Sequence, residues 1–366
     1  MVQRVEIGNQ RLRNSETFRV VYSFSRQPVA RALVLLVLIA GSGSWAIPAW
    51  GTTCTTQAEM QPQDRDALIA AATPLAQGIA AQNFDLLHAQ LLPAVAGDWE
   101  SIRSGAQAAS SILKGGELHW RNAYLLDATD LKAPTDAQFF CTNAENSLTV
   151  TINLRSLPIG RYALMLGDFA GSPLAGQIAL ILGVDTTSGG AWKLGGLFAR
   201  EGAFDGHDGV WYWTQAREQA TNNQSWSAWF SYDAARLLLL PVDFLSSPNL
   251  EKLVREQAHL KASPLDVLPL TVTAPSQTTG PTGAGKSWRI TAVRVDATLH
   301  TPDLGLTYEG TGLTEPQAAR AEAVAVMSAL LKLHPELRNS FHGLWAYAEK
   351  DGKQSYAIEQ AMHDIP

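Results

Sequence analysis

Leu148-Thr-Val-Thr-Ile-Asn-Leu154 alternates apolar side chains with Thr and Asn, so that every second side chain can face a core. This period of two is typical of a half-buried β-strand. The stretch Thr186-Thr-Ser-Gly-Gly190 has the composition of a hairpin turn between two further apolar runs. The sequence therefore predicts a meander of neighbouring strands at 117–127, 147–154, 161–169, 176–184 and 191–200.

The sequence before these strands has the longer period of helices. Apolar residues recur on one helical face, at Leu68, Ala72, Leu75 and Ile79. Pro74 lies among them and predicts a kink or an interruption. We expect a second helix over 86–92 with Asp85 as its cap, and a third over 101–112. Helices followed by an antiparallel meander predict an α+β fold for residues 63–204.

One family resemblance covers residues 63–200. Paired helices joined by Ala-Gln-Asn-Phe-Asp (81–85), and a sheet that ends in Ala-Trp-Lys-Leu-Gly-Gly-Leu-Phe (191–198), resemble the cone-shaped fold of nuclear transport factor two and ketosteroid isomerase. The resemblance implies a curved sheet around a cavity, in a family of enzymes and of binding or assembly modules. It carries over no catalytic acid or base. Tyr124 and Asp127 would line the cone, although ordinary sheet packing explains both.

Residues 205–262 are predicted to form a helical extension. Trp226, Trp229 and Phe230 share one helix face at i, i+3 and i+4. A single tetratricopeptide-like hairpin over 209–241 is indicated by Tyr212, Ala216, Ala228, Tyr232, Ala235 and, one place out of register, Pro241. We expect a hairpin packed on the preceding domain. The alternative is an aromatic groove for a peptide or carbohydrate, and the partner surface would then include Trp211, Trp213, Trp226 and Trp229.

The C-terminal part is predicted to be a second, smaller α+β domain over 288–366. A strand and a loop rich in Gly, Pro, Ser and Thr occupy 263–287 before it. We expect a strand at 288–299, a helix opened by the capping box Thr314-x-x-Gln317 and ended by Pro335, and two short strands at 343–349 and 354–361 around a turn.

The loop Gly280-Pro-Thr-Gly-Ala-Gly285-Lys286-Ser287 matches the phosphate-loop pattern in full. A phosphate loop also needs a buried strand before it and a helix N-terminus after it. The residues upstream are polar and broken by Pro275, and those from Trp288 onward alternate as a strand. We therefore interpret Gly280, Gly285, Lys286 and Ser287 as a decoy and expect no nucleotide cofactor.

The N-terminus has the three parts of a secretory signal peptide over residues 1–46. Six Arg precede a nine-residue apolar run at 32–40, and Ser44 and Ala46 provide small residues before a cleavage site. The run is too short to span a bilayer, which needs about 20 apolar residues. Because the basic region is long, we expect translation to start near Val20 or Val21. The alternative is an uncleaved leader that anchors the chain in the membrane. In both cases we expect residues 47–62 to form a linker.

The net charge and the two cysteines restrict the possible partners and the compartment of the protein. The net charge is −6, with +4 in residues 1–31 and −10 in the remainder, which argues against nucleic acid as a partner. The two cysteines, Cys54 and Cys141, could pair in an oxidising compartment or remain free. Asp205-Gly-His207-Asp208-Gly209 is the densest polar cluster, but its glycines indicate a turn rather than a metal site.

The prediction is an exported, periplasmic or secreted, non-catalytic binding or assembly module without cofactor or metal. Its partner would be an unidentified protein or a small apolar ligand, and the leader alone would contact a membrane if it is uncleaved. The alternative is an enzyme that uses the cone cavity for isomerase- or hydratase-like acid–base chemistry on a small apolar substrate. Nucleotide binding through 280–287 is the third interpretation.

Overall fold

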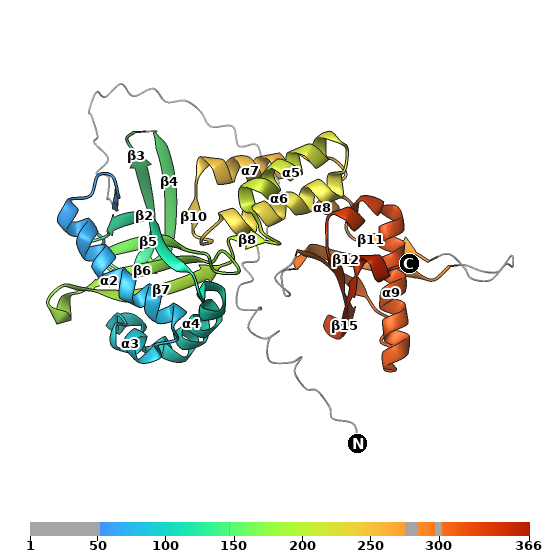
Figure 1. The fold of residues 1–366 in the computed structure, drawn as a ribbon, viewed down its shortest axis with the longest axis horizontal. Coiled ribbons are helices and arrows are strands. Elements are labelled where there is room, and N and C mark those ends of the chain that lie inside the picture. The colour runs from blue at the N-terminus through green and yellow to red at the C-terminus, as the bar shows by residue number, and fades with distance from the viewer. Residues whose placement is uncertain (1–51, 146, 275–284, 297–301) are drawn as a thin grey trace, which may run out of the picture. The chain divides into compact units, whose positions relative to one another are not determined.

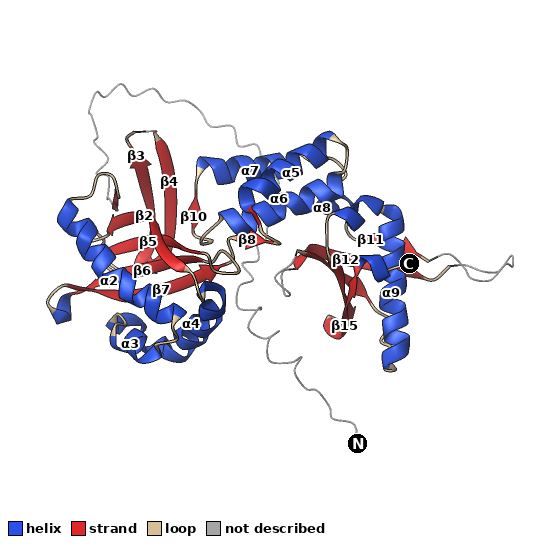
Figure 2. Ribbon diagram, viewed as in Figure 1, coloured by secondary structure: helices blue, strands red, loops and turns tan. Residues whose placement is uncertain are grey.

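The computed structural model describes residues 52–145, 147–274, 285–296 and 302–366. The predicted signal peptide, residues 47–51 of the predicted linker and residues 280–284 of the phosphate-like loop lie outside these residues. Residues Ala49–Pro366 form one compact unit. Helices and mainly antiparallel sheets occur in separate stretches of the chain, which confirms the α+β class (Figure 2).

A five-stranded antiparallel sheet organises the N-terminal part. Its order is β1-β2-β5-β6-β7, and its strands are β1 (Thr53–Thr56), β2 (Glu117–Asp127), β5 (Arg161–Ala170), β6 (Gln177–Asp185) and β7 (Ala191–Arg200). The four longer strands match the predicted ranges closely. Three strands form a second sheet in the order β10-β4-β3, namely β3 (Thr135–Asn143), β4 (Leu148–Leu157) and β10 (Leu245–Ser246).

Three helices cover one face of the larger sheet (Figure 1). They are α2 (Pro62–Ala80), α3 (Phe84–Ala89) and α4 (Trp99–Leu113). The prediction that Pro74 interrupts the first helix is wrong in part, because α2 continues through Pro74 and buries Ala72 and Leu75 beside it. Asn83 rather than Asp85 caps α3, since its side chain accepts a hydrogen bond from the Leu86 backbone amide at 3.2 Å.

The opposite face of the larger sheet packs against the smaller sheet. Their shared core contains buried Leu126, Phe139, Ile152 and Leu164. A disulfide joins Cys54 of β1 to Cys141 of β3, with the two Cα atoms 5.1 Å apart. Because β1 and β3 are the edge strands of their sheets, this bond fixes one sheet edge against the other.

A helical segment follows, with α5 (Gly209–Thr221), α6 (Ser225–Leu239), α7 (Pro248–Ala258) and the short α8 (Pro264–Val267). Helix α6 is buried on nearly every side, and its buried residues include Ser227 and Ser231. Trp226 and Trp229 are 2% and 9% exposed. The prediction that these two tryptophans belong to a partner surface is therefore corrected: they fill the core that α6 shares with the C-terminal elements.

The C-terminal sheet has the order β11-β12-β13-β14-β15. Its strands are β11 (Leu270–Thr273), β12 (Ser287–Asp296), β13 (Asp303–Glu309), β14 (Gly343–Lys350) and β15 (Lys353–Ala361). Helix α9 (Pro316–Leu333) connects the parallel pair β13 and β14. The predicted capping box is wrong, because Glu315 is the N-cap residue and no side chain caps the helix. Residues 297–299 of the predicted strand lie outside the described part.

Candidate functional site

Two adjoining cavities form an open groove between the larger sheet and the helical segment. Their volumes are about 370 and 640 Å³. Five residues line both cavities, namely Arg121, Asp168, Gln177, Val210 and Leu239. The first three come from the sheet strands β2, β5 and β6, and the other two come from α5 and α6. We refer to the two cavities together as the groove.

A β-bulge in β2 brings Arg121 into the groove. The pairing register with β5 shifts between Trp120 and Asn122, so that Arg121 is the extra residue. Trp120 packs on the helix-covered face, where its indole N–H donates to the Thr73 hydroxyl at 3.0 Å. Arg121 and Asn122 both line the cavity of 370 Å³, although strict alternation would place them on opposite faces. Bulges commonly redirect side chains in this way beside binding sites.

Glycine at position 167 is what permits this bulge to pack. A Cβ atom at Gly167 would lie 2.9 Å from the Trp120 ring and 3.0 Å from the His119 carbonyl oxygen. The backbone and the indole therefore occupy the space that any larger residue would need. The next residue along β5 is Asp168, which the close approach of the two strands places against Arg121.

Arg121 and Asp168 form an ion pair on the floor of the groove. The Arg121 Nε atom contacts an Asp168 carboxylate oxygen, and the side chains are 68% and 19% exposed. Burial raises the pKa of Asp168, while Arg121 and His119 oppose the shift. Because Arg121 is the more exposed of the two side chains, its guanidinium is the accessible partner of the pair, and the less exposed Asp168 carboxylate fixes its position.

The start of α5 forms the opposite wall. Asp208 caps this helix by accepting a hydrogen bond from the Trp211 backbone amide at 2.8 Å. His207 stacks on the Trp211 ring with centroids 3.8 Å apart. Val210 and Trp211 are 58% and 39% exposed, so this wall presents apolar surface to solvent. The polar cluster at 205–209 thus forms a turn that orients the first residues of α5.

The cavity of 370 Å³ is the more apolar end of the groove. Its apolar lining includes Leu148, Val150, Pro241, Leu245 and Leu250. Amide groups of Asn122 and Asn249 and the ring of Trp213 also line it. A pocket with mostly apolar walls and a few polar groups is the usual form of a ligand site.

Hydrogen bonds hold the end of α6 to the sheet beside the groove. Gln177 donates to the Leu238 carbonyl oxygen at 2.6 Å, and Arg200 donates to that of Leu240 at 2.9 Å. The last carbonyl oxygens of a helix lack hydrogen-bond donors within the helix. At the end of α6, the side chains of Gln177 and Arg200 provide these donors. The wall formed by α6 is therefore fixed relative to the floor.

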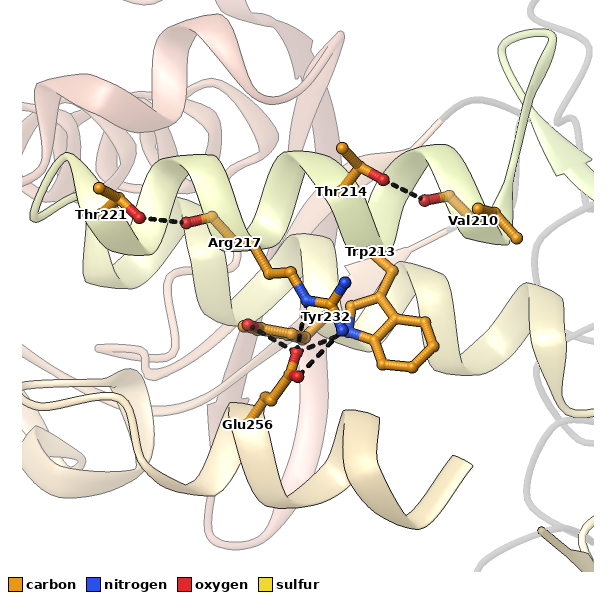
Figure 3. A network of polar contacts seen from close by, with 7 residues as sticks. All are labelled: Val210, Trp213, Thr214, Arg217, Thr221, Tyr232 and Glu256. Carbon is orange, nitrogen blue, oxygen red and sulfur yellow. Dashed lines mark hydrogen bonds and ion pairs between the residues drawn. The ribbon is translucent and has the colours of Figure 1, made fainter. Parts of the chain in front are cut away.

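A second polar network holds α5, α6 and α7 together (Figure 3). Glu256 of α7 accepts two hydrogen bonds from Arg217, at 2.8 and 2.9 Å, and one from the Trp213 indole at 2.7 Å. Tyr232 of α6 donates to the same carboxylate at 3.3 Å. The Arg217 bond is the main cause of a lowered Glu256 pKa. Because Trp213 lines the groove, this network sets the position of its ring.

Of the two residues proposed from sequence to line a cone, Tyr124 lies in the groove and Asp127 lies outside it. Tyr124 is buried and lines the cavity of 370 Å³, and burial raises its pKa. Asp127 instead closes a turn by accepting hydrogen bonds from the amide and hydroxyl of Thr129, at 2.9 and 2.6 Å. Among the described residues, no group of three or more His, Cys, Asp or Glu side chains could hold a metal ion.

The described end of the phosphate-like loop lies in a β-hairpin. Gly280 lies outside the described residues, whereas Gly285, Lys286 and Ser287 are described. Ser287 begins strand β12, and the Ala274 amide donates to the Lys286 carbonyl oxygen at 3.0 Å. The Lys286 ammonium binds buried Glu322 of α9 at 2.6 Å. No helix starts at Ser287, so the described residues lack the helix N-terminus that binds phosphate in such loops.

Comparison with known proteins adds no relative: no family model, curated protein or solved structure matches the chain. None of the helices within the described residues has the length and apolarity required to cross a bilayer. The groove therefore has to be interpreted from its own geometry.

Proposed function

We propose that the protein is an exported binding module that holds a segment of a partner protein in the groove. One observation carries the proposal: exposed apolar Val210 and Trp211 face an accessible, anchored cation, Arg121, across an open cavity. Apolar anchors combined with a few fixed polar groups are typical of surfaces that bind peptides. Export is supported by the leader pattern and by the Cys54–Cys141 disulfide, because disulfides persist mainly in oxidising compartments.

The packing of the sheets favours binding over catalysis inside a cone. The face opposite the helices is filled by side chains such as Phe139, Ile152 and Leu164, which are fully or almost fully buried. The groove lies at the edge of this core and is open to solvent. Open grooves suit extended peptides, whereas acid–base enzymes usually exclude water from the reacting atoms.

A peptide-display experiment tests this function. The mature protein is exposed to a library of short random peptides, and enriched sequences are measured by fluorescence anisotropy. We expect Val210→Asp to weaken their binding at least about tenfold, since it places a charge on an apolar wall. Val254→Asp is the matched control, because Val254 is 46% exposed on α7 and does not line the groove. No enrichment, or equal losses in both variants, would contradict the proposal.

An acid–base enzyme is the second candidate function. It is favoured by Tyr124 and Asp168, which line the same cavity and whose pKa values are both raised by burial. A proton-transfer site would exchange the α-hydrogens of small apolar ketones in D₂O, which NMR detects. Exchange that disappears in Asp168→Asn would support the enzyme, and no exchange across a ketone panel would count against it.

A further inference from the structure

We infer that the groove recognises the free C-terminal carboxylate of a partner peptide whose last residue is large and apolar. The inference rests on the proposed function and names the chemical group that Arg121 receives. It depends on three features: the accessibility of the guanidinium, the charge of its surroundings and the apolar cavity beside it.

The Arg121 guanidinium is prepared to bind an anion. Its Nε atom is already held by Asp168, and its side chain remains 68% exposed. A guanidinium carries five N–H donors in a planar fork, so donors remain after one edge is engaged. Fixing the group in advance reduces the entropy lost when a ligand binds. A carboxylate is the anion whose two oxygens match this fork.

Few other charges line the groove. Asp168 is paired with Arg121, and the Asp208 carboxylate is engaged with the backbone amide of Trp211. The neutral polar residues that line the apolar cavity include Asn122, Ser247 and Asn249. Arg121 is the only arginine or lysine among the residues that line the two cavities, so an anionic ligand finds its complementary charge at this residue.

The apolar cavity indicates where the anion lies on the peptide. Arg121 lines the 370 Å³ cavity together with Val150, Leu245 and Leu250. A main-chain carboxylate and an apolar side chain share one Cα atom only at the C-terminal residue of a peptide. That residue can place its side chain among these walls and its carboxylate on Arg121. The preceding residues then extend along Val210 and Trp211 in the cavity of 640 Å³.

The test uses two peptide arrays of identical random sequences, one with free C-terminal carboxylates and one with C-terminal amides. Wild-type protein should bind free-acid peptides that end in Leu, Phe, Ile or Val at least about tenfold more tightly than their amides. Arg121→Gln should remove that difference, because free-acid peptides then lose the guanidinium that receives their carboxylate. Arg103→Gln is the matched control, because Arg103 is an exposed arginine of α4 outside the groove.

The outcomes separate the inference from the proposed function. Equal binding of acids and amides that is lost in Val210→Asp would retain the peptide groove and overturn carboxylate recognition. Binding of small acids such as hexanoate, with no preference for any peptide, would also overturn the inference. Absence of binding to both arrays would remove the proposed function together with it. Acid-selective binding that requires Arg121 and not Arg103 supports both.

Discussion

Loss of the Cys54–Cys141 disulfide should cost the N-terminal part much of its stability. The bond closes a loop with a sequence separation of 87 residues and ties β1 to β3, the edge strands of two different sheets. Cys141 is 1% exposed. The perturbation is the double variant Cys54→Ala/Cys141→Ala, which removes the bond without leaving a free thiol.

The magnitude follows from the loop length. Cross-linking restricts the unfolded chain, and for a loop of this size the chain-entropy relation gives about 4.5 kcal/mol at 25 °C. Whole domains are stable by only about 5–15 kcal/mol, so the loss would be a large fraction of the total. In a domain of this size it corresponds to a decrease in Tm of roughly 10–15 °C.

The assay is guanidinium unfolding followed by tryptophan fluorescence, with a free-thiol assay to establish the redox state. Wild-type protein in reducing buffer is the control for side-chain packing, because it loses the bond but keeps both sulfur atoms. We expect reduced wild-type protein to unfold at about the same guanidinium concentration as the double variant, and at a clearly lower concentration than the oxidised wild type. If oxidised and reduced wild type unfold within about 0.5 kcal/mol of each other, the cross-link does not constrain the unfolded chain as argued here.

Three further predictions concern charged side chains that interact with other residues of the fold. Burial raises the pKa of Asp303, and the Gly343 amide, the Trp345 indole and His342 offset this shift only in part. The folded state therefore favours the protonated carboxyl and loses stability as the pH rises through the raised pKa. Asp303→Asn, which cannot ionise, should raise the free energy of unfolding at pH 7 by about 1 kcal/mol, whereas Asp296→Asn should lower it, because it weakens the hydrogen bond that the Tyr347 hydroxyl donates to Asp296. Glu256→Gln should lower it by about 2 kcal/mol in chemical denaturation, since its charge receives the Arg217 bonds. Lys286→Ala should lower the free energy of unfolding by about 2 kcal/mol, because Lys286 forms an ion pair with buried Glu322. Isothermal titration with ATP should show no binding for either the wild type or this variant.

Most strands of the larger sheet could be predicted from the sequence, including the almost uniformly buried β5. Strands β1, β3 and β13 were not predicted, although β3 alternates regularly between buried and exposed residues. Strand β2 was expected over 117–127 and occupies that range. Strand β13 has six buried residues followed by one exposed residue, so it lacks the alternation that identifies strands with one solvent face. Strand β1 has only four residues, and it is positioned by its pairing with β2 and by the disulfide. Both are contacts between residues far apart in the sequence, so a local pattern does not reveal them.

The groove shows why the site was missed even though local signals existed. Arg121-Asn122 are two consecutive polar residues that interrupt the alternation of residues 117–121, as expected at a bulge. Asp168 is the one carboxylate in the apolar run of β5. Each signal alone fits an ordinary exposed edge. Their meaning depends on the strand register, which pairs β2 with β5 and places Arg121 beside Asp168. It depends equally on α6, whose final carbonyls bind Gln177 and Arg200.

The tryptophans of α5 and α6 differ in exposure because other elements cover the two helices to different extents. A tryptophan contributes to a partner surface only if its helix has a face that no other element covers. Helix α6 contributes to the core shared with the C-terminal elements, and its tryptophans are buried there. Helix α5 begins at Gly209, where a Cβ atom would lie 2.6 Å from Leu239, so its first turn packs closely on the end of α6. Trp211 in that turn stays exposed. Close packing at Gly209 therefore buries one side of the turn and leaves the other to the groove, which predicts that Gly209→Val would disrupt the groove while Trp211→Ala would only remove its apolar wall.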